Sequence, residues 1–374
     1  MDADTPPGDV AQLRALAPTA QVTDNWEALL DAGLADAVLV ASGPEDLRAE
    51  PLRKLVQLGR PVLAAHPVFL STLVYFELDM IRHDTGSVLL AYLPDLGNPA
   101  IAHARSVLAE SAGPLQHVVF ERFFVRPARQ AVLDQFARDA VLLTQLCGEV
   151  TRLGAMGATA DQAEYVALGV QMTGPEGLLV RWSAAPAEGD LAARLKLLAA
   201  DRSATVEIWS QKPWSLELTV DGRTERPALA PWNAAGAALD ELRDAIAGNS
   251  QQERRATRDW TPAARSVELA ETVVRSLRKG RTLEVYREEH SEESTFKGTM
   301  AAAGCGLLMA GLLLLAIVAL ADDFARAAGF VIPLLRMWPY LIAVFLGIFL
   351  MMQLLTLVFR RKSTADDTDS PPPT

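Results

Sequence analysis

The chain has few of the residues that build disulfide frameworks or metal sites. Among its 374 residues only Cys147 and Cys305 are cysteines, which cannot build a disulfide framework and fit a reducing cytosol. Its five histidines show no metal-ligand spacing, and no cysteine pair accompanies them. We therefore expect no disulfide framework and no bound metal.

Concentrated positive charge is also lacking. The sequence holds 35 Lys and Arg against 46 Asp and Glu, which gives a net charge of −11 and a pI of about 5.1. The basic residues are scattered along the chain, whereas binding to nucleic-acid phosphates needs them gathered on one surface. We expect no nucleic-acid partner.

A third absence is the glycine-rich turn of dinucleotide-binding folds. No G-x-G-x-x-G motif occurs near the N-terminus. These glycines let the backbone approach a pyrophosphate at a helix N-terminus. Either the sequence starts downstream of the natural start, or the protein has lost this cradle.

Residues 1–20 also lack the basic start and apolar core of a signal peptide, so we expect no secretion signal.

A strand–helix–strand pattern is present in residues 36–67. Residues 37–41 and 61–65 are short apolar runs, typical of strands buried on both faces of a parallel sheet. Between them, residues 47–58 carry an apolar stripe at nearly helical spacing, and a glycine follows where a C-cap is expected. The pattern predicts a βαβ unit with a right-handed crossover.

Ligands of open parallel sheets bind beyond the carboxyl ends of the strands, so the residues there are candidate ligand contacts. They are Ser42, Gly43 and Pro44 after the first strand, His66 and Pro67 after the second, and Tyr92 at the end of a third predicted strand, residues 87–92.

From residue 115 onward the pattern changes to short successive strands. They are expected at residues 115–124, 150–156, 165–173, 177–184, 194–199, 205–209 and 216–220, with helices at 128–146, 234–247 and 260–277. The predicted fold class is α/β followed by α+β. An incomplete Rossmann-like parallel sheet forms residues 1–112, and a mostly antiparallel open-sheet domain with C-terminal helices forms residues 113–290. The open sheet is also where two copies of the chain would associate.

Two long apolar runs predict a transmembrane hairpin. Thr299–Ala321 and Met337–Phe359 are each 23 residues without a charge, enough to cross a bilayer core of about 30 Å. Residues 360–362 (RRK) follow the second span and Lys297 precedes the first, so the positive-inside rule places both termini and the soluble domain in the cytoplasm. Residues 360–374 form a polar, Pro-rich tail that we expect to be disordered. The lipid bilayer is the partner that this pattern implies.

Four motifs in order resemble one enzyme family. They are VTDNWEALLDAGLADAV (22–38), DAVLVASGP (36–44), GRPVLAAHP (59–67) and WTPAARSVELAETVVRSLRKGRTLEV (260–285). They are similar to the Gfo/Idh/MocA oxidoreductases, whose matching stretches read roughly DAVVIATP, then GKHVLCEKP, then a helix ending in S-x-x-x-G-x-x-V. The resemblance covers about residues 10 to 287, and it implies oxidation or reduction of a sugar or cyclitol with NAD or NADP.

The same resemblance assigns a proton-transfer position. The family's EKP lysine, which exchanges a proton with the reacting hydroxyl, falls on His66, and the preceding glutamate falls on Ala65. An imidazole can do this work because its ordinary pKa lies near neutrality. The alternative is a hydrogen-bonded surface histidine at a strand end.

The family's second motif is a helix with Asp, then His four residues on, then Asp three residues later. Aligned on the helix end at residues 146–148, these positions fall on Asp134, Arg138 and Val141, so that only the first matches. Arg138 cannot act as a base because it stays protonated, although it could bind a carboxylate or phosphate. Alternatively, Asp134 and Arg138 form an ordinary i,i+4 ion pair on the helix.

Two further residues are candidate substrate contacts. Trp182 falls in a predicted strand and would line a sugar-binding face of the sheet, although core packing is the commoner role of such a residue. Tyr92 is a candidate because it ends a parallel strand.

The sequence thus supports a membrane-anchored, Gfo/Idh/MocA-like protein with substituted catalytic motifs. One hypothesis is an NAD(P)-dependent oxidoreductase. A second is a non-catalytic sugar-binding or scaffold protein at the cytoplasmic membrane face. A third is a membrane-bound assembly factor whose hairpin is the functional part.

Overall fold

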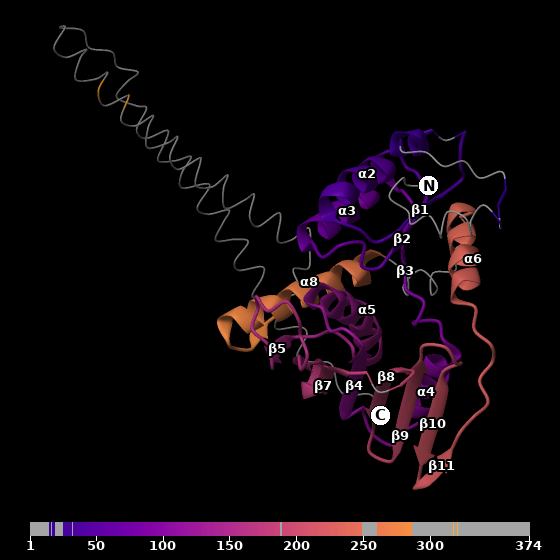
Figure 1. Cartoon of the computed structure of the whole chain (residues 1–374), viewed down its shortest axis with the longest axis vertical. Coiled ribbons are helices and arrows are strands. Elements are labelled where there is room, and N and C mark those ends of the chain that lie inside the picture. The colour runs from indigo at the N-terminus through magenta and orange to yellow at the C-terminus, as the bar shows by residue number, and fades with distance from the viewer. Residues whose placement is uncertain are drawn as a thin grey trace, which may run out of the picture. The chain divides into compact units, whose positions relative to one another are not determined.

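Figure 1 shows the computed structural model of the chain. It describes residues 25–31, 33–187, 189–248 and 260–285, and five isolated positions at 15, 17, 18, 317 and 320. The chain divides into two compact units, Met1–Tyr286 and Arg287–Thr374. All helices and strands named below belong to the first unit.

A three-stranded parallel sheet forms the N-terminal part of this unit. Its strands are β1 (Val38–Val40), β2 (Val62–Ala65) and β3 (Leu89–Tyr92), in that order, with Val38 opposite Val62 and Val62 opposite Leu89. The associated helices are η1 (Trp26–Leu30), α2 (Glu45–Gln57), α3 (Thr72–Thr85) and α4 (Pro99–Ala109).

Both faces of the parallel sheet are covered, as its branched apolar strands require. Leu52, Leu55 and Tyr75 from α2 and α3 pack with Val62 on one face. On the other face lies α6 (Ala234–Ile246), which comes from far along the chain (Figure 1). The sheet is therefore held between helices from distant parts of the sequence.

The second sheet is larger and mostly antiparallel. Its nine strands run in the order β11-β10-β9-β8-β4-β7-β6-β5-β12. They are β4 (His117–Phe124), β5 (Arg152–Met156), β6 (Gly169–Thr173), β7 (Leu179–Pro186), β8 (Leu191–Leu198), β9 (Arg202–Trp209), β10 (Ser215–Val220), β11 (Arg223–Glu225) and β12 (Leu283–Glu284). Only the β4–β7 pair is parallel. Helices α5 (Arg129–Cys147) and α8 (Trp260–Lys279) pack against this sheet and each other.

The predicted fold class is confirmed for these two sheets. A Rossmann-like parallel sheet is followed by a mostly antiparallel one, and the predicted helices lie close to α2, α5, α6 and α8. The strand expected from residue 165 begins only at Gly169. The short strands β11 and β12 were not predicted, because pairing with a neighbouring strand rather than a local pattern defines them.

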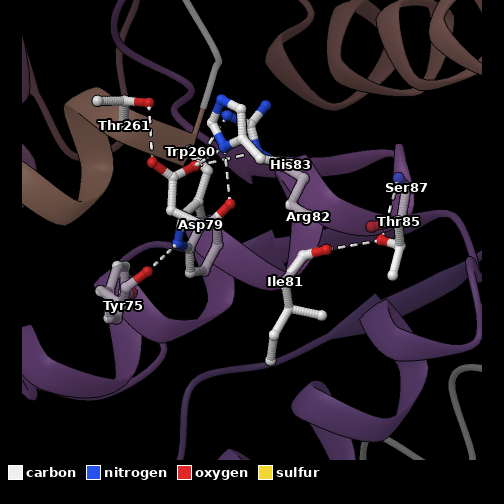
Figure 2. A network of polar contacts seen from close by, with 9 residues as sticks. All are labelled: Tyr75, Asp79, Ile81, Arg82, His83, Thr85, Ser87, Trp260 and Thr261. Atoms are coloured by element: carbon white, nitrogen blue, oxygen red, sulfur yellow. Dashed lines mark hydrogen bonds and ion pairs between the residues drawn. The ribbon is translucent and has the colours of Figure 1, made fainter. Parts of the chain in front are cut away.

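Helix α8 joins the two parts of the unit. Its first turn is fastened to α3, where Trp260 Nε1 donates to the Tyr75 carbonyl at 2.9 Å and Thr261 Oγ1 donates to Asp79 Oδ2 at 3.3 Å (Figure 2). The Trp260 and Tyr75 rings stack with centroids 4.6 Å apart. Further along, Val273 belongs to the core of the large sheet. Contacts thus cross the predicted boundary at residue 112, and that boundary stays a prediction.

The described residues include no helix that is both long and apolar enough to cross a bilayer. The two predicted spans lie outside these residues, apart from Ile317 and Leu320. The described part of the chain therefore gives no support to the predicted hairpin.

Candidate functional site

The structure brings together the loops that follow β1 and β2. Ser42 Oγ donates to the Pro67 carbonyl at 2.6 Å, and the Gly43 amide donates to the Val68 carbonyl at 2.9 Å. A Cβ on Gly43 would lie 2.8 Å from Arg48 Nε, so glycine leaves room for that side chain of α2. The predicted cofactor contacts Ser42, Gly43 and Pro67 are therefore neighbours, but their hydrogen-bonding groups already serve the loop itself.

His66 is buried rather than exposed at the strand end. Its side chain is 2% exposed, so the surface-residue alternative is wrong. Its Nε2 lies 2.8 Å from Ser266 Oγ on α8, and that hydroxyl donates its only proton to the Ala263 carbonyl. When the hydroxyl donates to Ala263, the Ser266 oxygen accepts from His66 Nε2–H. Within the described residues, buried His66 Nδ1 has no hydrogen-bond partner of normal geometry.

This environment keeps the His66 imidazole neutral. Burial lowers its pKa from 6.5 to about 3, the Ala137 backbone offsets part of that effect, and the positive charge of Arg138 adds to it. The expected near-neutral pKa is thus wrong for this arrangement. His66 can exchange protons with a substrate near neutral pH only if its surroundings rearrange.

An aromatic side chain of α3 holds the loop that contains His66. The Tyr75 hydroxyl accepts a hydrogen bond from the Val68 amide at 2.8 Å. The rings of His66 and Phe69 meet Tyr75 edge-on, with centroids 6.1 Å and 5.7 Å away. Because Tyr75 also stacks on Trp260, α8 and the His66 loop are fixed by the same residue.

Asp134 and Arg138 do not form the helix ion pair that was the alternative for them. Arg138 Nε donates instead to the His66 carbonyl at 2.8 Å, and Asp134 Oδ1 accepts from Gln130 Nε2 at 2.9 Å. Burial raises the pKa of Asp134, while the Gln130 hydrogen bond and the Arg138 charge lower it in part. Helix α5 thus presents an arginine and a half-buried carboxyl at the carboxyl end of β2.

Sequence reasoning missed Asp95, in the loop after β3. Its carboxyl group makes no hydrogen bond or ion pair within the part of the chain that the structure describes. Burial raises its pKa, the charges of Arg122 and Arg138 oppose that shift, and the Asp139 charge adds to it. Its position after a parallel strand, next to Tyr92, was the available signal.

Trp182 is part of a buried polar cluster and not of an open ligand surface. Its ring is fully buried against Phe136, and its Nε1 donates to Asp139 Oδ2 at 2.8 Å. Asp139 also pairs with Arg122 and accepts from Gln135 Nε2 at 3.0 Å. The prediction that Trp182 contacts a ligand is therefore wrong for this structure, because no face of the ring is accessible.

Tyr92 lies half-buried at the end of β3, where it packs with the cluster formed by Leu63, Leu90 and Leu242 of α6. The neighbouring Pro94 carbonyl accepts from Trp232 Nε1 at 3.1 Å. Ligand contact by Tyr92 stays a prediction.

The helix N-termini at this edge of the sheet do not fit a dinucleotide pyrophosphate. In α2 the first turn carries Glu45 and Asp46, whose negative charges oppose an anion there. In α3 the Thr72 amide already donates to Glu271 Oε1 at 3.0 Å. In α4 the Asn98 side chain accepts from the Ala100 amide at 2.9 Å. In α3 and α4 an amide of the first turn that could contact a phosphate thus already donates to a side chain, whereas α2 has no side-chain cap and opposes an anion only through its two acidic residues. No group of three metal ligands occurs in the described ranges.

Comparison with known proteins identifies the fold. No protein-family model and no curated protein matches this chain. Among solved structures, UDP-N-acetylglucosamine 3-dehydrogenase from Acidithiobacillus ferrooxidans is 22% identical with a TM-score of 0.60, over 72% of this chain and 86% of that one. Aldose-aldose oxidoreductase from Caulobacter crescentus is 16% identical with a TM-score of 0.63, over 75% and 89%.

A third solved structure, a putative NADPH-dependent oxidoreductase from Desulfitobacterium hafniense, is 13% identical with a TM-score of 0.65, over 74% of this chain and 88% of that one. At these identities the likeness shows the fold alone. The fold that the Gfo/Idh/MocA resemblance implied is confirmed to that extent.

Proposed function

We propose that this chain is an oxidoreductase of the Gfo/Idh/MocA type that acts on a sugar or cyclitol with NAD or NADP. The observation that carries the proposal is the hydrogen bond from Arg138 Nε to the His66 carbonyl. It holds the charged face of α5 against the carboxyl end of β2, where ligands of parallel sheets bind. The similarity in fold to solved oxidoreductases supports the same conclusion.

The charged groups here suit a polyhydroxylated substrate. Carboxylates accept hydrogen bonds from sugar hydroxyls, and Arg138 can donate to them. Oxidation of a hydroxyl also needs a group that takes its proton, and a raised pKa brings a carboxyl nearer to that task. Asp95 and Asp134 both have raised pKa values, whereas His66 is held neutral by burial. We assign the proton-accepting role to one of these two carboxyls.

The cofactor is the weakest fit. A nicotinamide dinucleotide would supply the hydride acceptor, but the described helix N-termini do not favour its pyrophosphate: α2 begins with two acidic residues, and amides at the starts of α3 and α4 already donate to side chains.

The experiment is a turnover assay of the full chain with sugars and cyclitols, in which reduction of NAD or NADP is followed by absorbance. Asp95→Asn and Asp134→Asn are compared with Asp84→Asn, an exposed carboxyl at the end of α3. Loss of the proton acceptor is expected to lower kcat by about 10²–10⁴-fold, with no effect of Asp84→Asn. Absence of turnover with either cofactor across the panel would contradict the proposal.

The notable state of His66 keeps a second hypothesis, a non-catalytic sugar-binding or scaffold protein, open to the same test, although the similar solved structures do not favour it. His66 stands at the family's proton-transfer position, yet it is neutral, buried and bonded to Ser266. Sugar binding to the full chain without any turnover would favour this second function over the first.

We also propose that the chain is held to the cytoplasmic face of a bilayer by residues 299–321 and 337–359, and that copies associate through the open sheet. Support comes from the length and uncharged composition of the two runs.

A further inference from the structure

We propose that the ligand of this site is an acidic sugar, whose carboxylate or phosphate is received by Arg138. The inference rests on the proposed function for the sugar class of the ligand and adds the anionic group.

Arg138 is an exposed residue, but its guanidinium group is held in one orientation by a hydrogen bond. Its Nε donates to the His66 carbonyl at 2.8 Å, 72 residues away in sequence. Nη1 and Nη2 have no hydrogen bond or ion pair with any residue that the structure describes. The protein therefore orients the planar fork through one nitrogen and leaves the other two available.

An oriented guanidinium matches an oxyanion better than a neutral hydroxyl. Two N–H groups of the fork can donate in parallel to two oxygens of a carboxylate or phosphate, and such charge-assisted bonds are about twice as strong as neutral ones. Part of the side-chain entropy lost on binding has already been spent on the contact with His66, which favours affinity.

Of the two arginines in this cluster, Arg138 is the one whose charge is available to a ligand. Arg122, the other arginine of this cluster, is paired with Asp139 in the buried network. Asp134 is held by Gln130 and makes no direct contact with Arg138 in the described structure. The Arg138 charge lowers the pKa of Asp95, but the two side chains form no ion pair.

Protonation of the neighbouring acids should strengthen anion binding. The groups that face Arg138 are Asp134 on its own helix, Asp95 after β3 and neutral His66 after β2. The pKa values of both carboxyls are raised, so they lose negative charge earlier than ordinary carboxyls as the pH falls. The affinity for an acidic sugar should therefore increase as these carboxyls take up protons, whereas that for a neutral sugar should not.

The test is calorimetric titration of the full chain with glucuronate, glucose 6-phosphate and glucose at fixed ionic strength. We expect one acidic sugar to bind about 10–100-fold more tightly than glucose, the size of one or two charge-assisted hydrogen bonds. The glucuronate and phosphate arms show which oxyanion the site takes. Equal affinity for all three sugars, or no binding of either acid, would overturn the inference.

Arg138→Ala should abolish the preference for the acidic sugar, and Arg138→Lys should retain part of it. The matched control is Arg181→Ala, which removes the same charge from an exposed side chain of β7 on the face opposite the buried Trp182. Equal losses in Arg138→Ala and Arg181→Ala would refute the assignment. Arg138→Lys serves as the folded comparison if Arg138→Ala is unstable.

The outcome separates this inference from the proposed function. Turnover of neutral cyclitols with NAD or NADP, without any preference for acids, would leave the oxidoreductase standing and remove the acidic ligand. Arg138-dependent binding of an acidic sugar without turnover would support the acidic ligand and contradict the oxidoreductase.

Discussion

Asp139 and His66 are both buried, but only Asp139 has a charged partner. It pairs with Arg122 and accepts from Trp182 and Gln135, so its charge is compensated on several sides. His66 has one neutral partner, Ser266, and is kept uncharged instead. These are the two ways in which a protein can bury an ionisable group, and each leads to a measurable consequence.

Asp139→Ala should lower the free energy of unfolding by about 3–5 kcal/mol, because it leaves the buried Arg122 charge and the Trp182 N–H without an acceptor. Urea unfolding at neutral pH measures this. The double variant Arg122→Met with Asp139→Leu should recover most of the loss, since a matched apolar pair removes both charges together. A change below about 1 kcal/mol in the single variant would mean that the pair is not buried as described.

His66 should make the protein less stable in acid. Its pKa is about 3 in the folded chain and 6.5 as the ordinary value. Above pH 6.5 neither state is protonated there. Between about 6.5 and 3 only the unfolded state takes up the proton, so stability falls by about 1.4 kcal/mol per pH unit as the pH decreases.

His66→Asn removes this proton uptake, so between pH 7 and pH 5 the wild type should lose about 2 kcal/mol more than the variant. His103→Asn, at an exposed position of α4, serves as the control and should keep the wild-type slope. Unfolding curves at several pH values give the slopes, which remain informative even if His66→Asn lowers stability throughout. Parallel wild-type and His66→Asn profiles would disprove the assignment.

Among the elements, α8 has the largest effect on the site. Its first residue, Trp260, is hydrogen-bonded to α3. Further along, Ser266 lies beside His66, and Glu271 accepts from the amide at the start of α3. Its sequence pattern predicted a helix but not these partners, which lie about 200 residues earlier in the chain.

Trp260→Ala should lower the free energy of unfolding by about 3–5 kcal/mol, the cost of removing a buried aromatic side chain. Trp260→Phe keeps a ring to stack on Tyr75 and loses the hydrogen bond to its carbonyl, at about 1 kcal/mol. Hydrogen exchange should show the first loss of protection in α3 and the His66 loop. If the large sheet loses protection first instead, α8 does not fasten α3 as Figure 2 indicates.

Local patterns predicted the elements well and the site only in part. Apolar periodicity located α2 and β2, and the rule for parallel sheets brought Ser42 and Pro67 together, because both effects act within a short stretch of chain. The bond from Arg138 to the His66 carbonyl could not be foreseen, since a backbone acceptor has no sequence signature. The burial of Trp182 likewise depends on α5 covering β7, a contact between distant segments.

For the whole molecule, the acidic first turn of α2 and the occupied amides at the starts of α3 and α4 predict weak dinucleotide binding. Residues 1–290 should bind NADH or NADPH with a Kd above about 100 µM, because most affinity for a pyrophosphate comes from free backbone amides at a helix N-terminus. Isothermal titration decides this. A Kd in the low micromolar range would show that residues outside the described ranges complete the cradle, and Ser42 and Gly43 would then be the contacts to mutate first.

Removal of residues 291–374 should convert the chain from a membrane-bound to a soluble protein. Two uncharged runs of 23 residues supply the only proposed attachment, and each is long enough to span a hydrocarbon core of about 30 Å. Fractionation of cells that express the full and the shortened chain measures the distribution.

Single cysteines placed at residues 330 and 368 then test topology, with Cys305→Ser as the background. Only the cysteine at residue 330 should react with an impermeant reagent added outside intact cells, because the positive-inside rule predicts that residues 360–362 hold the tail in the cytoplasm. Labelling at residue 368 would contradict the orientation, and a shortened chain that stays with the membrane would contradict the anchor itself.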